Sequence, residues 1–132
     1  MMNGGGVVLI VDDHPAVARS LVSLICGSGF DAQAVHSGGE ALAFVRGHAA
    51  VALILLDTSM PDMSGVDVLR AMRVPGGGYS HVPVVMFSMD DDQTTRDALS
   101  RLGATGFVSK TDPGGLLRVV AAYVRPTTPP LV

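Results

Sequence analysis

Residues 51–57 read Val-Ala-Leu-Ile-Leu-Leu-Asp, an uninterrupted apolar run that ends in an aspartate. A run of this length without polar alternation predicts a β-strand buried on both faces, which is typical of the inner strands of a parallel sheet. A second run of the same kind, Val7–Val11, comes earlier and ends in the acid pair Asp12-Asp13. The two runs therefore predict the centre of a sheet that is covered on both sides.

Strand-like and helix-like segments alternate outward from these runs along the whole chain. Strands are expected at about 7–11, 31–35, 51–56, 82–87 and 106–109, and helices at about 15–27, 38–47, 65–73, 90–102 and 113–125. Strict alternation with short connections predicts an α/β fold, a doubly wound five-stranded parallel sheet with strand order 2-1-3-4-5. In such a sheet, ligands bind beyond the carboxyl ends of the strands.

Characteristic residues mark the ends of several predicted helices and the face of the first helix that should pack against the sheet. Ser37-Gly38-Gly39-Glu40 fits a capping box, and Asp112-Pro113 fits an N-cap followed by proline at the first helical position. Gly27 and Gly103 fit helix C-caps. In the first helix the apolar residues at helical spacing are Val17, Leu21, Leu24 and Ile25. We also expect Cys26 in the core of the domain.

The composition describes one globular domain. The chain has 132 residues, of which 48% are hydrophobic and 16% charged, and this excludes a disordered chain. A single cysteine excludes an intrachain disulfide and a cysteine-based zinc site. We expect a flexible N-terminal segment 1–6, a domain over 7–125 and a Pro-rich tail over 126–132.

Neither the charge nor the hydropathy of the chain indicates a nucleic-acid or membrane partner. The net charge of −3 gives no electrostatic reason to bind nucleic acid directly or an anionic membrane. The apolar runs are far shorter than the roughly 20 residues of a membrane span. The start Met1-Met2-Asn3 lacks the basic and apolar regions of a signal peptide. We therefore expect a cytoplasmic domain.

Polar side chains follow four of the five predicted strands at the point where each strand ends. They are Asp12 and Asp13, Asp57, Ser88, and Lys110. Because these four strands are neighbours in the predicted order, the side chains should meet at one edge of the sheet. Clustered carboxylates repel each other and favour a bound cation, and oxygen ligands with room for water suit Mg²⁺. An aspartate carboxylate is also a phosphoryl acceptor, with a hydroxyl and an ammonium nearby to stabilise the phosphoryl oxygens.

The segment that follows the third strand makes this pattern more specific. Residues 57–65 read Asp-Thr-Ser-Met-Pro-Asp-Met-Ser-Gly. Together with the acid pair, Ser88 and Lys110, this segment resembles the receiver domain of two-component response regulators, from Val7 to about Arg125. The resemblance implies the flavodoxin-like (βα)5 fold. It also implies a phosphoacceptor regulator instead of an enzyme, which assists its own phosphorylation and dephosphorylation and takes its phosphoryl group from a histidine kinase or phosphotransfer protein.

The resemblance also implies roles for individual residues. Asp57 would be the phosphoacceptor, and Lys110 would pair with the phosphoryl group. Ser88 would move toward that group and let Phe107 turn inward, although a plain core role for Phe107 is an equal alternative. Four groups would hold Mg²⁺: the side chains of Asp12, Asp13 and Asp57, and the backbone carbonyl of Ser59.

Two positions depart from the usual receiver pattern. Met89 stands where a small residue usually follows the hydroxyl, and Thr111 stands where proline usually follows the lysine. The positions that the resemblance connects with water entry are Ser59 and Asp90, and Met89 adds apolar bulk beside them. These three rate-modulating residues lead us to expect a long-lived phosphoryl group.

The output of such a domain is a changed surface, since we see no second domain after the receiver pattern. We expect that surface on the helix at 90–102, the strand at 106–109 and the last helix, where it would bind a partner or form a homodimer. Candidate surface residues there are Arg96, Arg101 and Arg118. The alternative is a pseudo-receiver, a docking module that works without phosphorylation; Met89 favours it, and the complete set of acids, hydroxyl and lysine argues against it.

Overall fold

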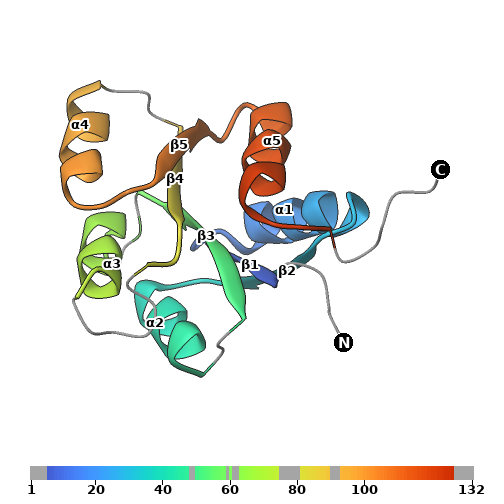
Figure 1. Cartoon of the computed structure of the whole chain (residues 1–132), viewed down its shortest axis with the longest axis horizontal. Coiled ribbons are helices and arrows are strands. Elements are labelled where there is room, and N and C mark those ends of the chain that lie inside the picture. The colour runs from blue at the N-terminus through green and yellow to red at the C-terminus, as the bar shows by residue number, and fades with distance from the viewer. Residues whose placement is uncertain are drawn as a thin grey trace.

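Five parallel strands form one sheet with the order β2-β1-β3-β4-β5, which confirms the predicted α/β fold and strand order (Figure 1). A computed structural model of the chain describes residues 6–47, 50–58, 60, 63–74, 81–89 and 93–126. The strands are β1 (Val7–Val11), β2 (Asp31–Val35), β3 (Val51–Asp57), β4 (Val84–Ser88) and β5 (Gly106–Ser109). The helices are α1 (Pro15–Gly27), α2 (Gly38–Gly47), α3 (Gly65–Met72), α4 (Gln93–Arg101) and α5 (Pro113–Tyr123).

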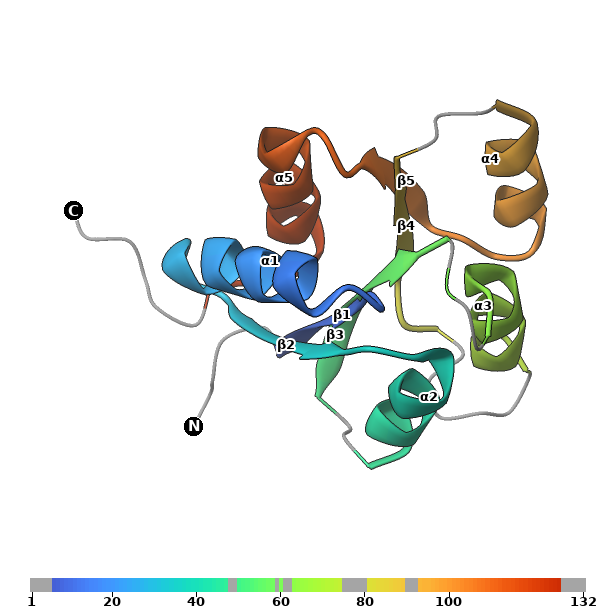
Figure 2. The same ribbon diagram turned by 180° about the vertical axis from the view of Figure 1, so that it is seen from behind.

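Helices cover both faces of the sheet, with α1 and α5 on one face and α2, α3 and α4 on the other (Figures 1 and 2). Successive residues of a strand point to opposite faces. Val8 and Ile10 accordingly pack into the core beneath α1 and α5, while Leu9 and Val11 pack into the core beneath α2, α3 and α4. Both faces of β1 and β3 are buried, which explains why these strands contain no polar alternation.

Several element ends differ from the sequence expectation for local reasons. β4 begins at Val84, not at residue 82, because Pro83 has no N–H to donate to a neighbouring strand. α1 includes Gly27, so the prediction of Gly27 as its C-cap was wrong; Ser28 is the cap, and Gly29 has the positive φ of 97°. α5 ends at Tyr123 because the next residue is extended. The expected helix start at 90–92 lies outside the described residues.

The two predicted N-terminal caps are present, one of them in altered form. The backbone N–H of Glu40 donates to Ser37 Oγ at 3.1 Å, as in a capping box. The Glu40 carboxylate, however, accepts from the backbone N–H of His36 at 2.8 Å, one residue before the position that the capping box uses. Asp112 caps α5 by accepting from the N–H of Gly115 at 2.9 Å.

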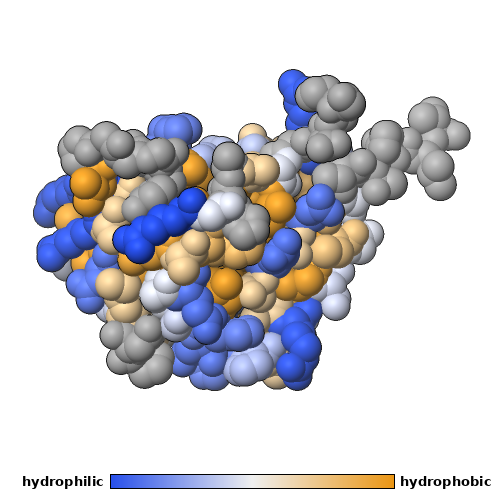
Figure 3. All heavy atoms as spheres, turned by 90° about the horizontal axis from the view of Figure 1, so that it is seen from below, coloured by the Kyte–Doolittle hydropathy of each residue, from blue (hydrophilic) through white to orange (hydrophobic). Residues whose placement is uncertain are grey.

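The expectation that Cys26 lies in the core was wrong, since its side chain is exposed. Successive helical residues are about 100° apart around the axis, and Ile25 takes the buried position next to it. Val17 falls at the same spacing as the inner residues but is 39% exposed. On the face drawn in Figure 3, hydrophobic and hydrophilic residues are interspersed, as is normal for a protein surface.

Arg73, the residue after α3, links this helix to the segments that precede β4 and β5. These segments lie at the amino ends of the strands, opposite the edge that carries the acid pair. Arg73 Nε donates to the carbonyl of Gly103 at 3.0 Å, and Nη1 donates to the carbonyl of Val82 at 2.8 Å. Burial lowers the pKa of the Arg73 guanidinium from its ordinary value. Gly103 has a φ of 105°, and a Cβ there would lie 3.0 Å from the Arg73 side chain. Both facts require glycine at this turn, as predicted for the end of the helix before β5.

None of the described helices is both long enough and apolar enough to cross a membrane. The division into a segment 1–6, a domain 7–125 and a tail 126–132 stays a prediction, because residues 1–5 and 127–132 lie outside the described part of the chain.

Candidate functional site

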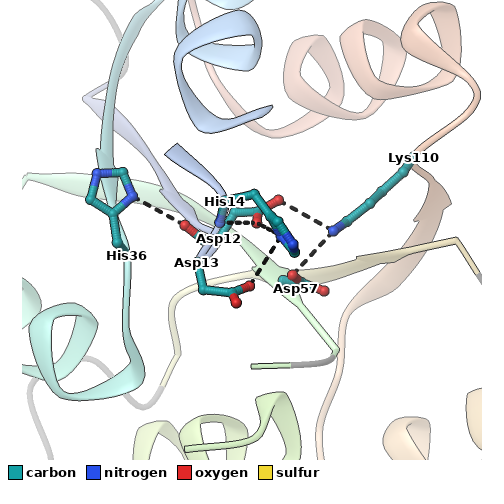
Figure 4. Close-up of polar contacts among 6 residues, drawn as sticks. All are labelled: Asp12, Asp13, His14, His36, Asp57 and Lys110. Atoms are coloured by element: carbon teal, nitrogen blue, oxygen red, sulfur yellow. Dashed lines mark hydrogen bonds and ion pairs between the residues drawn. The ribbon is translucent and has the colours of Figure 1, made fainter. Parts of the chain in front are cut away.

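Three carboxylates and one ammonium meet at the carboxyl edge of the sheet (Figure 4). Asp12 and Asp13 follow β1, Asp57 ends β3, and Lys110 follows β5. Asp12 is completely buried and Asp57 is 2% exposed. Buried charges of one sign are costly unless opposite charges or hydrogen bonds compensate them. The strand-end argument therefore placed these four side chains correctly in space, and their charges require partners.

Lys110 supplies part of that compensation. Its Nζ lies 3.2 Å from Asp12 Oδ2 and 3.1 Å from Asp57 Oδ2, with 15% of the side chain exposed. The same Nζ lies 5.0 Å from the centre of the Phe87 ring, within the range of a cation–π contact. One ammonium is thus shared between carboxylates from two adjacent strands, and negative charge remains in excess at the site.

His14 also faces the carboxylates. Its backbone N–H donates to Asp12 Oδ1 at 2.9 Å, and its ring Nδ1 lies 3.2 Å from that oxygen and 3.3 Å from Asp13 Oδ1. A second histidine, His36, approaches from β2, with Nδ1 3.1 Å from the carbonyl oxygen of Asp12. His36 follows directly after β2, the strand next to β1, and its side chain is exposed.

The donor set at this edge suits a hard divalent cation. Asp12 Oδ2 and Asp13 Oδ1 are buried, and beyond the contacts with Lys110 Nζ and His14 Nδ1 they accept no hydrogen bond from the described residues. One ligand atom each of Asp12, Asp13, His14 and Asp57 can be chosen so that all lie within 4.8 Å of one another. Ligands on opposite sides of a Mg²⁺ ion are about 4.2 Å apart. The carboxylates are therefore close to the spacing that such an ion requires.

Ser88 and Phe107 lie beside this cluster. Ser88 ends β4, between β3 and β5 in the sheet, and its carbonyl accepts from the Lys110 N–H at 3.0 Å. Phe107 on β5 is half-buried, and the guanidinium carbon of Arg96 on α4 lies 5.5 Å from its ring centre. The ring also packs against the core beneath α2, α3 and α4. The core role and the switch role of Phe107 therefore both stay open.

The residues predicted to modulate the rate are placed only in part. Met89 follows β4 and is 68% exposed, so most of its thioether side chain is in contact with solvent. Ser59, predicted also as a metal ligand through its carbonyl, and Asp90 lie outside the described residues. Thr111 follows Lys110 through a trans peptide bond, like every other described residue.

The sequence model of the response regulator receiver domain matches residues 8–121, which is most of the chain. This chain belongs to that family. The resemblance seen in residues 57–65 is thereby confirmed, and the receiver domain described above has the fold of solved receivers. The Vibrio cholerae chemotaxis protein CheY4 superposes with a TM-score of 0.82 at 25% identity, over 89% of this chain and 98% of CheY4. A response regulator receiver protein from Pseudomonas putida gives 0.81 at 26% identity, over 89% and 96%.

Two curated mycobacterial proteins are similar in sequence to the receiver domain. The DNA-binding response regulator MtrA of Mycolicibacterium smegmatis is 37% identical over 121 residues, which cover 89% of this chain and 50% of MtrA. The sensory transduction protein RegX3 of the same species is 38% identical over 104 residues, covering 78% and 43%. The chain thus spans about half the length of these relatives or less. DNA binding belongs to the name of MtrA, whereas the expectation of no direct nucleic-acid contact came from the charge of these 132 residues and concerns only them.

Proposed function

We propose that this receiver domain is a cytoplasmic phosphoacceptor module that takes a phosphoryl group on Asp57 from a histidine kinase or a phosphotransfer protein. The observation that carries the proposal is the position of Lys110, whose ammonium lies between the carboxylates of Asp12 and Asp57. A cation at 3.1 Å from an Asp57 oxygen is close enough to move onto a phosphoryl group attached there.

In the proposed reaction a carboxylate oxygen of Asp57 attacks phosphorus as the bond from phosphorus to the donor atom breaks, and the donor leaves with that electron pair. Lys110 then exchanges one carboxylate contact for a phosphoryl oxygen, and the Ser88 hydroxyl donates a hydrogen bond to another. Bound Mg²⁺ would supply further positive charge against the phosphoryl oxygens. The groups that would hold it are Asp12, Asp13, Asp57 and the backbone carbonyl of Ser59.

Intact-mass spectrometry after treatment with acetyl phosphate and Mg²⁺ tests this proposal. We expect the protein to gain the mass of one phosphoryl group and to lose it with hydroxylamine, which cleaves acyl phosphates. Beryllium fluoride, a phosphoryl mimic, should occupy the same site and change the NMR spectrum. An unchanged mass together with unchanged spectra would favour the pseudo-receiver, which is the other outcome of this experiment.

Replacing Asp13 by asparagine is expected to weaken Mg²⁺ binding by about 1–3 kcal/mol, the scale of one lost charged ligand. Titration calorimetry measures this directly. Asp31→Asn is the matched control, because Asp31 is an exposed aspartate at the amino end of β2, away from the acidic edge. Equal Mg²⁺ affinity of Asp13→Asn and the control would contradict the assignment of Asp13 as a ligand.

Phosphorylation is expected to change the surface formed by α4, β5 and α5, and with it partner binding or homodimer formation. This surface adjoins Ser88 and Phe107, and it carries the exposed side chains of Arg101 and Arg118. Arg96, predicted as a surface residue, is half-buried against the Phe107 ring. Hydrogen exchange with and without beryllium fluoride should show altered exchange in α4 and β5. Changes confined to the surroundings of Asp57 would refute this output.

The exposed thioether of Met89 is free to fold over a phosphoryl group and restrict water there. If it does, Met89→Ala should speed both phosphorylation by acetyl phosphate and subsequent hydrolysis, by about twofold to fivefold each, on the scale of one small contact of ~0.5–1 kcal/mol. Intact-mass spectrometry of samples quenched at successive times measures both rates. Wild-type rates for both reactions would show that Met89 does not gate the site.

A further inference from the structure

The connection between β5 and α5 is a hydrogen-bonded turn with Lys110 at its first corner. The N–H of Asp112 donates to the carbonyl of Ser109 at 3.1 Å, which makes Lys110 and Thr111 the two central residues of a β-turn. The N–H of Thr111 donates to Ser109 Oγ at 3.1 Å, and the hydroxyl oxygens of Ser109 and Thr111 lie 2.8 Å apart. The Ser109 side chain therefore joins the residues on both sides of Lys110.

The contacts between Ser109 and Thr111 depend on a hydroxyl at position 109 and on a residue with a backbone N–H at position 111. Proline at position 111 would have no N–H to donate to Ser109 Oγ. Proline is also disfavoured at the third position of the commonest β-turn type, and turns with a cis-proline at that position form a separate type; the described peptide bonds are trans. Two hydroxyl groups and a backbone N–H thus hold a turn that a proline ring does not restrict here.

The position of the Lys110 ammonium depends on this turn. The backbone N–H of Lys110 donates to the carbonyl of Ser88 at 3.0 Å, which holds one side of the residue to β4. The other side is held by the Ser109–Thr111 contacts. The long side chain then reaches Asp12 and Asp57 at 3.2 and 3.1 Å. Because Nζ is far from the backbone, a small rotation of the turn displaces it from the carboxylates.

We propose that Ser109 and Thr111 are positioning residues that hold Lys110 for contact with the phosphoryl group. This inference rests on the proposed function of Asp57 and Lys110. Among the candidate Mg²⁺ ligands, Asp12 and Asp13 follow β1 and Asp57 ends β3, so their positions do not depend on the turn after β5. Loss of the hydroxyl contacts should therefore weaken binding of a phosphoryl mimic and leave Mg²⁺ affinity unchanged, or raise it slightly because Lys110 competes with Mg²⁺ for the same carboxylates.

Four variants test the proposal through two separate affinities. Ser109→Ala removes both side-chain contacts, Thr111→Val removes only the hydroxyl, and Thr111→Ser keeps it. Ser28→Ala is the control, since it removes an exposed serine hydrogen bond of 3.0 Å at the end of α1. The measurements are Mg²⁺ affinity alone, beryllium fluoride affinity at saturating Mg²⁺, and the rate of phosphorylation by acetyl phosphate.

We expect Ser109→Ala to lower beryllium fluoride affinity and the phosphorylation rate by about fivefold, and Thr111→Val by about twofold, on the scale of one or two exposed hydrogen bonds. Thr111→Ser and Ser28→Ala should match wild type, and Mg²⁺ affinity should not fall in any variant. Wild-type values for Ser109→Ala and Thr111→Val, or an equal loss of Mg²⁺ and beryllium fluoride affinity, would overturn the inference. If Ser109→Ala does not fold, the comparison of Thr111→Val with Thr111→Ser decides it. A wild-type protein that takes up neither beryllium fluoride nor a phosphoryl group would overturn the proposed function itself.

Discussion

Replacing Asp57 by asparagine is expected to abolish phosphorylation by acetyl phosphate, with no phosphoryl adduct at a time when the wild-type protein is fully modified. The amide has nearly the shape of the carboxylate but lacks the anionic oxygen that attacks phosphorus. Asp12 is not a substitute in this proposal, because it is held by His14 and Lys110 and has no exposed surface. Intact-mass spectrometry under identical conditions measures the difference.

The control for this experiment is Asp31→Asn, which makes the same chemical change at an exposed aspartate. It should be modified at the wild-type rate. Unchanged circular dichroism would establish that Asp57→Asn is folded. If Asp57→Asn gained the same adduct as the wild-type protein, another residue would be the acceptor, and peptide mapping after borohydride reduction would locate it.

Replacing Lys110 by methionine is expected to lower the free energy of unfolding by about 3 kcal/mol in the absence of Mg²⁺, because two buried carboxylates lose their shared counter-charge. Methionine keeps much of the apolar stem that packs near Phe87, so the lost charge dominates the effect. Mg²⁺ should restore part of the loss, since a cation again neutralises the carboxylates. Urea unfolding in EDTA and in saturating Mg²⁺ measures both values.

Lys110→Arg is the matched variant for this measurement, because it keeps the positive charge and changes the shape. It should unfold at nearly the wild-type urea concentration in EDTA. If Lys110→Met were as stable as the wild-type protein in EDTA, the ammonium would not compensate the carboxylates in solution. The reason for assigning Lys110 to the phosphoryl group would then be lost as well.

The features that could be predicted from the sequence are those that depend on a continuous pattern of residues, such as an apolar run and the polar residue that ends it. The apolar runs of β1 and β3 and the alternation of strands with helices predicted the covered parallel sheet. The meeting of Asp12, Asp57 and Lys110 followed from the positions of these residues at the strand ends. The predicted ends of strands and helices were less accurate where a single residue determines the end. Pro83, for example, shortens β4 because it lacks an N–H.

Contacts that depend on three-dimensional orientation could not be predicted. Cys26 is apolar enough for a core, and only the rotation of α1 relative to the sheet places it in solvent. The contact of His36 with the Asp12 carbonyl requires the register of β1 and β2. The shared hydroxyl contact of Ser109 and Thr111 requires a turn conformation that no residue type imposes by itself.

The Arg73 contacts bear on how the proposed movement of Ser88 would spread through β4. The amino end of this strand is fixed, since Arg73 holds the Val82 carbonyl and Thr105 Oγ1 accepts from the Val84 N–H at 3.0 Å. Ser88 is at the other end. A displacement of Ser88, as proposed for phosphorylation, should therefore be largest at the carboxyl end of β4 and should decrease toward the end that Arg73 and Thr105 hold.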